Sequence, residues 1–278
     1  MDRNQINDMK KKIEALDLEN KHLKKQINAI HYFLVNSRLL ESSVNNEIVS
    51  DLMPCFKVKN SESEVLVLAF SGMNLRIGMP TFEFMKTLKN QDCSCIFFKD
   101  FYQVWYQQGL LGLTDDVYET RNLIQSMIKE INPRYIVSIG VSTGGYAAIM
   151  FGILLRINRV LAFSPQSRVG RGIYNQFHSI DSPEIQDFKS RGKYIWDLSK
   201  LIGDYSWEQN IPEISVYYGE LNSNDKRHAE RLARFENVKL CPLAGYKGHN
   251  SAGFLKKESR LESVLAEVLK FDDKVSEL

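Results

Sequence analysis

The chain has 278 residues, of which 36 are Lys or Arg and 34 are Asp or Glu, so its net charge is +2. This balance excludes electrostatic binding of nucleic acid as the main function, and a hydrophobic fraction of 44% excludes disorder along the whole chain. The cysteines at Cys55, Cys93, Cys95 and Cys241 have the spacing of neither a metal site nor a disulfide framework. Because the N-terminus is also polar, without the pattern of a secretory signal, we expect a cytoplasmic protein.

Residues 1–35 carry a heptad repeat. Its core positions are apolar except for Asn20; in chain order they are Ile6, Met9, Ile13, Leu16, Asn20, Leu23, Ile27, Ile30 and Leu34. Ile at a with Leu at d favours two strands, and a single Asn at an a position favours a parallel dimer in register. We therefore predict a parallel coiled coil over 1–35, with a dimer favoured over a trimer. An amphipathic helix lying on its own domain is the alternative.

A polar connector is expected at 36–51, followed by one α/β domain over 52–278. Strands are predicted at 55–59, 65–70, 94–98, 135–139, 159–163, 214–218 and 238–241, and helices at 80–88, 115–131, 144–155, 226–235 and 252–269. This alternation predicts a mostly parallel sheet with helices on both faces. The interval 166–212 interrupts it, and we expect an insertion there over the C-terminal edge of the sheet, where such sheets bind ligands.

The uncharged run 135–155 is long enough to cross a bilayer. However, it contains several glycines and hydroxyl residues, which suit a strand, a tight turn and a buried helix better. We therefore expect no transmembrane segment.

Gly140-Val141-Ser142-Thr143-Gly144 matches the pattern Gly-x-Ser-x-Gly and lies directly between a predicted strand and a predicted helix. In that context the glycines permit the strained turn that holds a serine hydroxyl above a sheet, and the helix N-terminus offers free N–H groups to an oxyanion. A phosphate-binding turn is the alternative, but the Lys of a P-loop and the pattern Gly-x-Gly-x-x-Gly are both absent. The motif therefore predicts Ser142 as a nucleophile.

A serine nucleophile needs a base, and in this architecture the acid and the base follow the serine along the chain. Asp225, after the strand at 214–218, is the predicted acid; Glu220 is the reserve, and helix capping is the alternative role of Asp225. His249 lies in a glycine-flanked loop before the last predicted helix, where the base belongs. His228 is expected on a solvated helix face.

Two backbone N–H groups are the predicted oxyanion-hole donors. One belongs to Thr143, the residue after the nucleophile, and the other to Met73, in the loop after the strand at 65–70. A plain strand-to-helix turn would account for that loop equally well. We predict neither a metal site nor a bound cofactor, because serine chemistry needs neither.

Aromatic and amide side chains are expected near the same edge of the sheet. Trp105, Tyr106, Gln103 and Gln166 follow predicted strands and would suit a polar ring with apolar faces, such as a sugar. Ordinary packing explains each of them at least as well.

Ser142, Asp225 and His249, with the strand order around them, resemble the α/β-hydrolase superfamily over about residues 52–270. More narrowly, the runs 99–106, 162–166 and 225–232 resemble hydrolase-like proteins found with bacterial capsule and surface-polysaccharide enzymes. Some members of that group are similar to capsule O-acetyltransferases, which move acetyl from acetyl-CoA to a sugar hydroxyl. The resemblance thus implies acetyl-CoA as a possible acyl donor.

Three functions remain open at this point. The first is a Ser-His-Asp acyl-transfer enzyme acting on a polar, carbohydrate substrate as a polysaccharide O-acetyltransferase, which the resemblance places slightly ahead. The second is a carbohydrate ester hydrolase. The third is a non-catalytic module that docks through its coiled coil into a polysaccharide-synthesis complex. The expected partners are a second copy of the chain and a carbohydrate polymer or small ester, with no nucleic acid.

Overall fold

The computed structural model describes residues 8–13, 16, 53–73, 82–169, 194–207 and 210–270. Residues 8–13 are helical, and the side chains of Met9, Ile13 and Leu16 are exposed in the single chain. The rest of the predicted coiled coil and the connector lie outside the described residues. The heptad interpretation and the oligomeric state therefore stay predictions.

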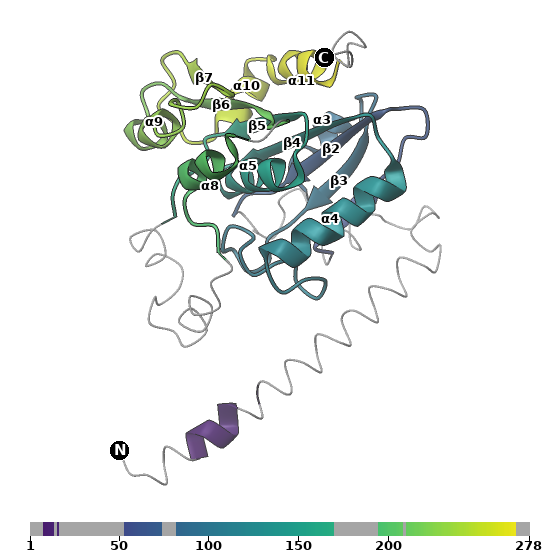
Figure 1. The fold of residues 1–278 in the computed structure, drawn as a ribbon. Coiled ribbons are helices and arrows are strands. Elements are labelled where there is room, and N and C mark those ends of the chain that lie inside the picture. The colour runs from purple at the N-terminus through teal and green to yellow at the C-terminus, as the bar shows by residue number, and fades with distance from the viewer. Residues whose placement is uncertain are drawn as a thin grey trace.

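A seven-stranded sheet forms the centre of the domain (Figure 1). Its strands are β1 (Cys55–Val58), β2 (Val65–Phe70), β3 (Ser94–Phe98), β4 (Tyr135–Val141), β5 (Arg159–Phe163), β6 (Glu213–Gly219) and β7 (Val238–Leu243). They lie in the order β1-β3-β2-β4-β5-β6-β7, and β1 is antiparallel to β3 whereas the other neighbours are parallel. The predicted α/β class with a mostly parallel sheet is confirmed. The C-terminal ends of β2 to β7 consequently share one edge.

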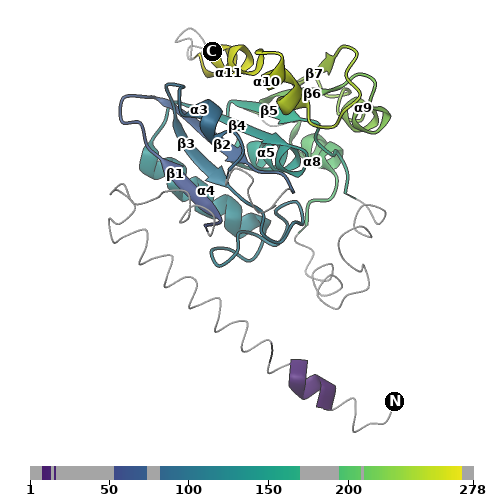
Figure 2. The ribbon, with the colours of Figure 1, turned by 180° about the vertical axis from the view of Figure 1, so that it is seen from behind.

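Helices cover both faces of the sheet (Figures 1 and 2). They are α3 (Met85–Leu88), α4 (Val117–Ile131), α5 (Thr143–Leu155), α8 (Leu198–Tyr205), α9 (Ser223–Glu230), α10 (Ser251–Lys257) and α11 (Leu261–Leu269). Leu66, Leu68 and Phe70 of β2 belong to the core formed with α4, α5 and α8, whereas Val65, Val67 and Ala69 belong to the core formed with α3, α10 and α11. Alternate side chains of a strand point to opposite faces, so burial on both faces explains the continuous apolar run of β2.

The predicted helix 252–269 is two helices, because Ser259 between α10 and α11 has a φ of 54°. The N–H groups of Ser259 and Arg260 bond back to the carbonyl oxygens of Lys256 and Leu255, at 3.0 and 2.8 Å, and close the end of α10. Leu255 and Leu261 on the two sides of the break are buried in the same core, so the apolar pattern does not mark it.

α5 accounts for most of the uncharged run 135–155, and it is buried along nearly its whole length between the sheet and the helices on that face. Nowhere in the described ranges is a helix both long and apolar enough to cross a membrane. The interval 166–212 contains α8, and its residues 170–193 lie outside the described part.

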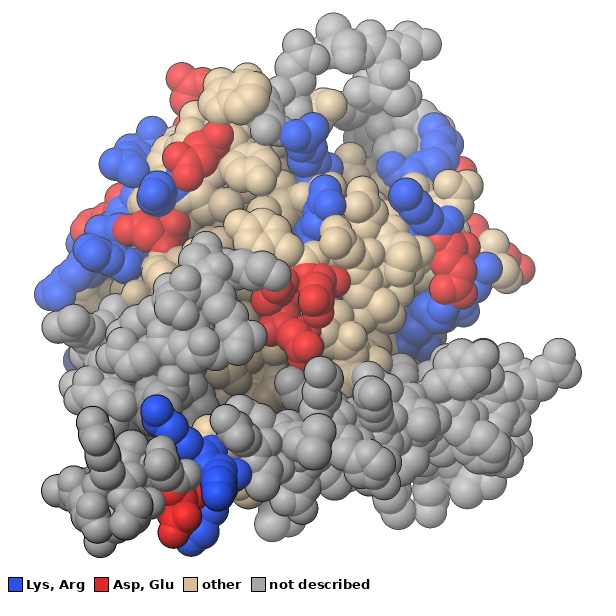
Figure 3. All heavy atoms as spheres, turned by 60° about the horizontal axis from the view of Figure 1, so that its bottom comes forward, with Lys and Arg blue, Asp and Glu red and all other residues tan. Residues whose placement is uncertain are grey.

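Charged side chains lie mainly on the surface, and on the face shown in Figure 3 Lys and Arg side chains are interspersed with Asp and Glu. The buried charged residues that the structure describes are Lys99, Asp100, Asp116 and Asp225. Asp116 caps α4, because its Oδ1 accepts the N–H of Glu119 at 2.8 Å. Asp100 and Asp225 instead follow strands at the C-terminal edge, and both take part in the site described next.

Candidate active site

Ser142 occupies the turn between β4 and α5 with φ 56° and ψ −116°, a strained conformation for a residue with a side chain. Its N–H donates to the carbonyl oxygen of Phe163 at 2.8 Å, and its carbonyl oxygen accepts the N–H of Tyr146 at 3.0 Å. Gly144 is required two residues later, because a Cβ there would lie 2.1 Å from the carbonyl oxygen of Phe70. The turn thus places Ser142 at the C-terminal edge of the sheet.

Two hydrogen bonds join Ser142, His249 and Asp225. Nε2 of His249 lies 2.9 Å from Oγ of Ser142, and Nδ1 of His249 lies 2.8 Å from Oδ1 of Asp225. Asp225 is 5% exposed and His249 46% exposed. The structure therefore brings together the three residues that the sequence singled out, in the connectivity of a nucleophile, a base and an acid.

Asp225 lies in the first turn of α9, but it does not cap this helix. Asn222 does, because its side-chain oxygen accepts the N–H groups of Asn224 and Asp225, both at 3.2 Å. The carboxylate of Asp225 is thereby left for His249. Glu220, the reserve acid, accepts the N–H of Gly245 at 2.9 Å and so braces the loop that leads to His249.

Ser71 to Met73, after β2, lie beside the turn of Ser142, since a Cβ on Gly72 would be 3.0 Å from the carbonyl oxygen of Val141. The N–H of Gly72 donates to Oε2 of Glu83 at 3.0 Å, and burial raises the pKa of Glu83 to about 7. Thr143 is the first residue of α5, where a backbone N–H has no partner within the helix. The Met73 and Thr143 amides stay the predicted oxyanion donors.

Tyr106 is fully buried, and its hydroxyl lies 2.9 and 3.0 Å from the carbonyl oxygens of Ser71 and Phe98. This environment corresponds to the packing alternative for Tyr106 rather than to a surface open to a sugar, and burial raises the pKa of its hydroxyl well above the usual range. The Tyr106 hydroxyl thus contacts the backbone at the C-terminal ends of β2 and β3, where the segment Ser71 to Met73 begins. Gln103 is half-buried, and its N–H donates to the carbonyl oxygen of Asp100 at 3.2 Å.

Asp100 shapes the loop after β3, a role that the sequence analysis missed. Its Oδ2 accepts the N–H groups of Val104 and Tyr106 at 2.7 and 2.8 Å, and burial raises its pKa to about 6. The loop is strained, with φ values of 54°, 56° and 59° at Gln103, Trp105 and Tyr106. An Asp two residues after an apolar strand gives no sequence sign of this role, because the role depends on how the following loop folds around the carboxylate.

Gln166 and Trp105, both predicted substrate contacts, contact each other, and Gln166 also contacts the candidate nucleophile. Nε2 of Gln166 lies 3.2 Å from Oγ of Ser142, and Oε1 of Gln166 accepts the indole N–H of Trp105 at 3.2 Å. In the residue that follows Gln166, the N–H of Ser167 donates to Nδ1 of His228 at 3.1 Å. His228 is therefore half-buried instead of lying on a solvated face, and this burial lowers its pKa.

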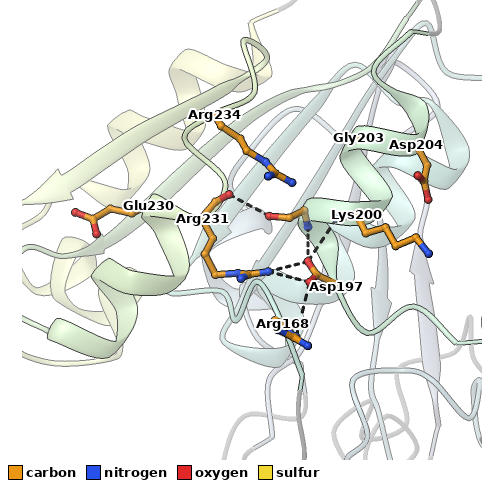
Figure 4. Close-up of a pocket in the computed structure, with 9 residues that line it drawn as sticks. Arg168, Asp197, Lys200, Gly203, Asp204, Glu230, Arg231 and Arg234 are labelled. Carbon is orange, nitrogen blue, oxygen red and sulfur yellow. Dashed lines mark hydrogen bonds and ion pairs between the residues drawn. The ribbon is translucent and has the colours of Figure 1, made fainter.

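An open hollow of about 660 Å³ lies between α8 and α9 (Figure 4). Its lining includes the basic side chains of Arg168, Lys200, Arg231 and Arg234, and we call it the basic hollow. Asp197 lies within it and accepts two hydrogen bonds from Nη2 of Arg231, at 2.8 and 3.0 Å. The guanidinium group of Arg234 points into the hollow, the carboxylate of Glu230 points away from it, and the side chains of Lys200 and Asp204 lie at its edge (Figure 4). Because Arg168 follows Gln166 by two residues, the hollow adjoins the segment that contacts Ser142.

No family model and no curated protein sequence matches the chain. Solved structures do resemble it. The capsule O-acetyltransferase of Neisseria meningitidis serogroup A covers 78% of this chain and 91% of its own, with a TM-score of 0.56 and 16% identity. The fluorophosphonate-binding serine hydrolase FphF of Staphylococcus aureus covers 77% and 86%, with a TM-score of 0.52 and 11% identity.

The chain has an α/β-hydrolase fold. Est1E from Butyrivibrio proteoclasticus shares it over 78% of this chain and 93% of its own, with a TM-score of 0.50 and 13% identity. A histidine-to-alanine variant of the Neisseria enzyme has been solved in complex with CoA and matches with a TM-score of 0.57. The predicted resemblance in fold is thus confirmed, and at these identities the similarity extends to the fold alone.

Proposed function

We propose that this protein is an acyl-transfer enzyme that forms an acyl-enzyme on Ser142, with acetyl-CoA as donor and a carbohydrate hydroxyl as acceptor. The observation that carries the proposal is the chain of hydrogen bonds from Ser142 through His249 to the buried Asp225. A serine hydroxyl becomes a useful nucleophile when such a base takes its proton.

In the first half of the reaction, Oγ of Ser142 attacks the acetyl carbonyl carbon while Nε2 of His249 accepts the hydroxyl proton. Asp225 stabilises the imidazolium that forms. The N–H groups of Thr143 and Met73 donate to the oxyanion. The carbon–sulfur bond then breaks, and the thiolate of CoA takes the proton from His249, which leaves an acetyl ester on Ser142.

In the second half, His249 removes the proton of the acceptor hydroxyl, whose oxygen attacks the acetyl ester. The bond between Oγ of Ser142 and the acetyl carbon breaks, and Oγ recovers a proton from His249. The enzyme returns to its resting state and the product is an O-acetylated sugar. Both halves use the same base and the same oxyanion donors.

Two features support CoA as donor. CoA carries phosphate groups far along the molecule from its thioester, and the basic hollow near Gln166 offers such groups the guanidinium group of Arg234 and, at its edge, Lys200. Arg168 lines the hollow too, but its Nε is paired with Oδ2 of Asp197 at 3.8 Å. The second is the structural similarity to a capsule O-acetyltransferase, a variant of which binds CoA. That enzyme also motivates the carbohydrate acceptor.

Ester hydrolysis is the second candidate, and the exposure of His249 favours it. A base that is 46% exposed is open to solvent, so water can replace the sugar hydroxyl in the second half of the reaction. The structural similarity to a serine hydrolase and to Est1E agrees with this candidate.

Acetyl-CoA labelled in the acetyl group, incubated with a panel of capsule polysaccharides, tests both candidates. Transfer predicts label in the polymer together with an equal amount of free CoA. Hydrolysis predicts free labelled acetate and turnover of 4-nitrophenyl acetate without label in any polymer. Ser142→Ala is the control for both reactions. Failure of both in the unmodified protein would contradict the enzymatic proposal and favour the non-catalytic module.

A further inference from the structure

We infer that Trp105 and Gln166 extend the hydrogen-bond chain of Ser142, His249 and Asp225 by two residues and leave the hydroxyl proton of Ser142 free for His249. The inference rests on the proposed function, because it takes Ser142 as the nucleophile. Its basis is a pair of contacts: Nε1 of Trp105 lies 3.2 Å from Oε1 of Gln166, and Nε2 of Gln166 lies 3.2 Å from Oγ of Ser142.

The indole of Trp105 fixes the orientation of the Gln166 amide. An indole N–H can only donate, so the atom of Gln166 that faces it must be the carbonyl oxygen, and the NH₂ group must face Ser142. If the amide were flipped, the NH₂ group of Gln166 would lie 3.2 Å from the indole N–H of Trp105, and both groups are donors. Trp105 therefore excludes the flipped amide.

This orientation leaves the hydroxyl proton of Ser142 free for His249. The carboxylate of Asp225 can only accept, so Nδ1 of the neutral His249 carries the proton and Nε2 is unprotonated. Since Gln166 donates to Oγ, it does not compete for the O–H of Ser142, which is directed to Nε2 of His249 at 2.9 Å. The N–H at Nδ1 in turn donates to Oδ1 of Asp225 at 2.8 Å. Every bond from Trp105 to Asp225 runs from donor to acceptor in one direction. This is the protonation state in which His249 acts as a base.

Gln166 also contacts the atom whose charge changes during the reaction. Oγ of Ser142 loses its proton to His249 as it bonds to the acyl carbon, and it recovers a proton when that bond breaks. A donor on Oγ stabilises negative charge in both steps. Gln166 is therefore a catalytic residue, and Trp105 is a positioning residue that acts through it.

The fold holds both side chains in place. Trp105 is 2% exposed, and Oδ2 of Asp100 accepts the N–H groups of the residues before and after it, at 2.7 and 2.8 Å. Next to Gln166, the N–H of Ser167 is fixed by Nδ1 of His228. Because Oε1 and one N–H of Gln166 are engaged inside the protein, only its second N–H remains for a substrate.

The test uses the full-length protein and two readouts: the rate of labelling by a fluorophosphonate probe, and kcat and KM for hydrolysis of 4-nitrophenyl acetate. In labelling, Oγ of Ser142 bonds to phosphorus, fluoride leaves, and the hydroxyl proton goes to His249, so neither CoA nor a sugar is needed. The variants are Gln166→Leu, Gln166→Glu and Trp105→Phe. Trp207→Phe is the matched control, because the indole of Trp207 is 78% exposed and donates to the carbonyl oxygen of Asp204 at 2.7 Å, away from this chain of hydrogen bonds.

Gln166→Leu should lower kcat and the labelling rate about tenfold, the equivalent of one neutral hydrogen bond, with KM nearly unchanged. Trp105→Phe should act in the same direction, because the amide is then free to flip. Gln166→Glu should lose more than Gln166→Leu, because a carboxylate accepts the O–H of Ser142 and diverts it from His249. Trp207→Phe should leave both rates unchanged.

Unchanged rates in Gln166→Leu, or a change confined to KM, would overturn the role of Gln166. Equal losses in Gln166→Glu and Gln166→Leu, or full activity in Trp105→Phe, would overturn the assigned direction. If circular dichroism shows that Trp105→Phe does not fold, the two variants of Gln166, which is half-buried, test the inference by themselves. Failure of the unmodified protein to label at Ser142 would overturn the proposed function and this inference with it.

Discussion

Oδ1 of Asp225 lies 2.8 Å from Nδ1 of His249, and the side chain of Asp225 is only 5% exposed. Glu220, by contrast, accepts the N–H of Gly245 and has no such contact with His249 among the described hydrogen bonds. We predict that Asp225→Asn lowers kcat roughly 10⁴-fold, because the new amide can donate to Nδ1 and favour the wrong tautomer of His249. Glu220→Gln should cost less than about tenfold, because Gln keeps an acceptor for Gly245. Steady-state kinetics with a small ester measures both variants. The reverse ranking would move the acid to Glu220.

Ser142→Ala and His249→Ala should each lower turnover by roughly 10³- to 10⁶-fold, because nucleophile and base act as one unit. For the same reason the double variant should be little worse than either single variant. Ester hydrolysis gives the rates, and circular dichroism checks that each variant is folded. More than a tenth of the activity in folded Ser142→Ala would show that the reaction does not use this serine.

The meeting of Ser142, Asp225 and His249 could be anticipated because it depends on topology. These residues follow β4, β6 and β7, and parallel strands bring their C-terminal ends to one edge. Chain order alone therefore brings the side chains into one neighbourhood, and the glycines around Ser142 mark the turn.

The contact of Gln166 with Trp105 and Ser142 could not be anticipated in the same way. It depends on a loop in which Trp105 and Tyr106 have positive φ, and these residue types give no sign of that conformation. The hydrogen bonds that hold the loop come from Asp100, whose role is visible only when the backbone is folded around it. The break at Ser259 was missed for the related reason that the apolar pattern continues across it.

Replacing basic side chains of the basic hollow should weaken the use of acetyl-CoA selectively. In the double variant Lys200→Gln and Arg234→Gln, we predict that KM for acetyl-CoA rises about tenfold, since charge-assisted hydrogen bonds to phosphate are each worth about 1.5–3 kcal/mol and these are partly solvated. KM for 4-nitrophenyl acetate, which has no phosphate, should not change. Lys57→Gln, on β1 at the opposite end of the sheet, is the matched control. If KM rose equally for acetyl-CoA and for 4-nitrophenyl acetate, the CoA phosphates would not bind in the basic hollow.

Glu83 should make the protein less stable as pH rises. Burial raises its pKa from 4.5 to about 7, so its stabilising contribution is complete below pH 4.5 and is lost as the pH rises through 7. Glu83→Gln stays uncharged and keeps an acceptor for the N–H of Gly72. We predict that the variant becomes increasingly more stable than the unmodified protein between pH 4.5 and 7.5, by about 1.4 kcal/mol for each unit of pKa difference.

Urea unfolding at the two pH values measures this difference. Asp100, whose pKa is raised to about 6, acts in the same direction, but it is present in both proteins and cancels. Glu62→Gln, at an exposed position, is the matched control and should give the same difference at both pH values. A constant difference for Glu83→Gln as well would show that the carboxyl is not buried in solution.

The heptads of residues 1–35 lead to a last prediction, on the oligomeric state. Removing 1–35 should leave a folded domain, because every described strand and the residues Ser142, Asp225 and His249 lie beyond residue 52. That domain should hydrolyse a small ester at nearly the full rate but be monomeric by light scattering. Its action on a long polymer should fall, since linked sites raise the local concentration of the second site.

Asn20→Ile in the full chain separates the heptad interpretation from a helix that lies on its own domain. A buried Asn at an a position lowers stability and specifies two parallel strands, so Ile at this position should raise the thermal stability of the assembly and allow higher oligomers to appear in light scattering. On a helix packed against its own domain, the same change would leave a monomer. A monomeric full-length protein, or a truncated protein that still associates, would show that the heptads do not form a coiled coil.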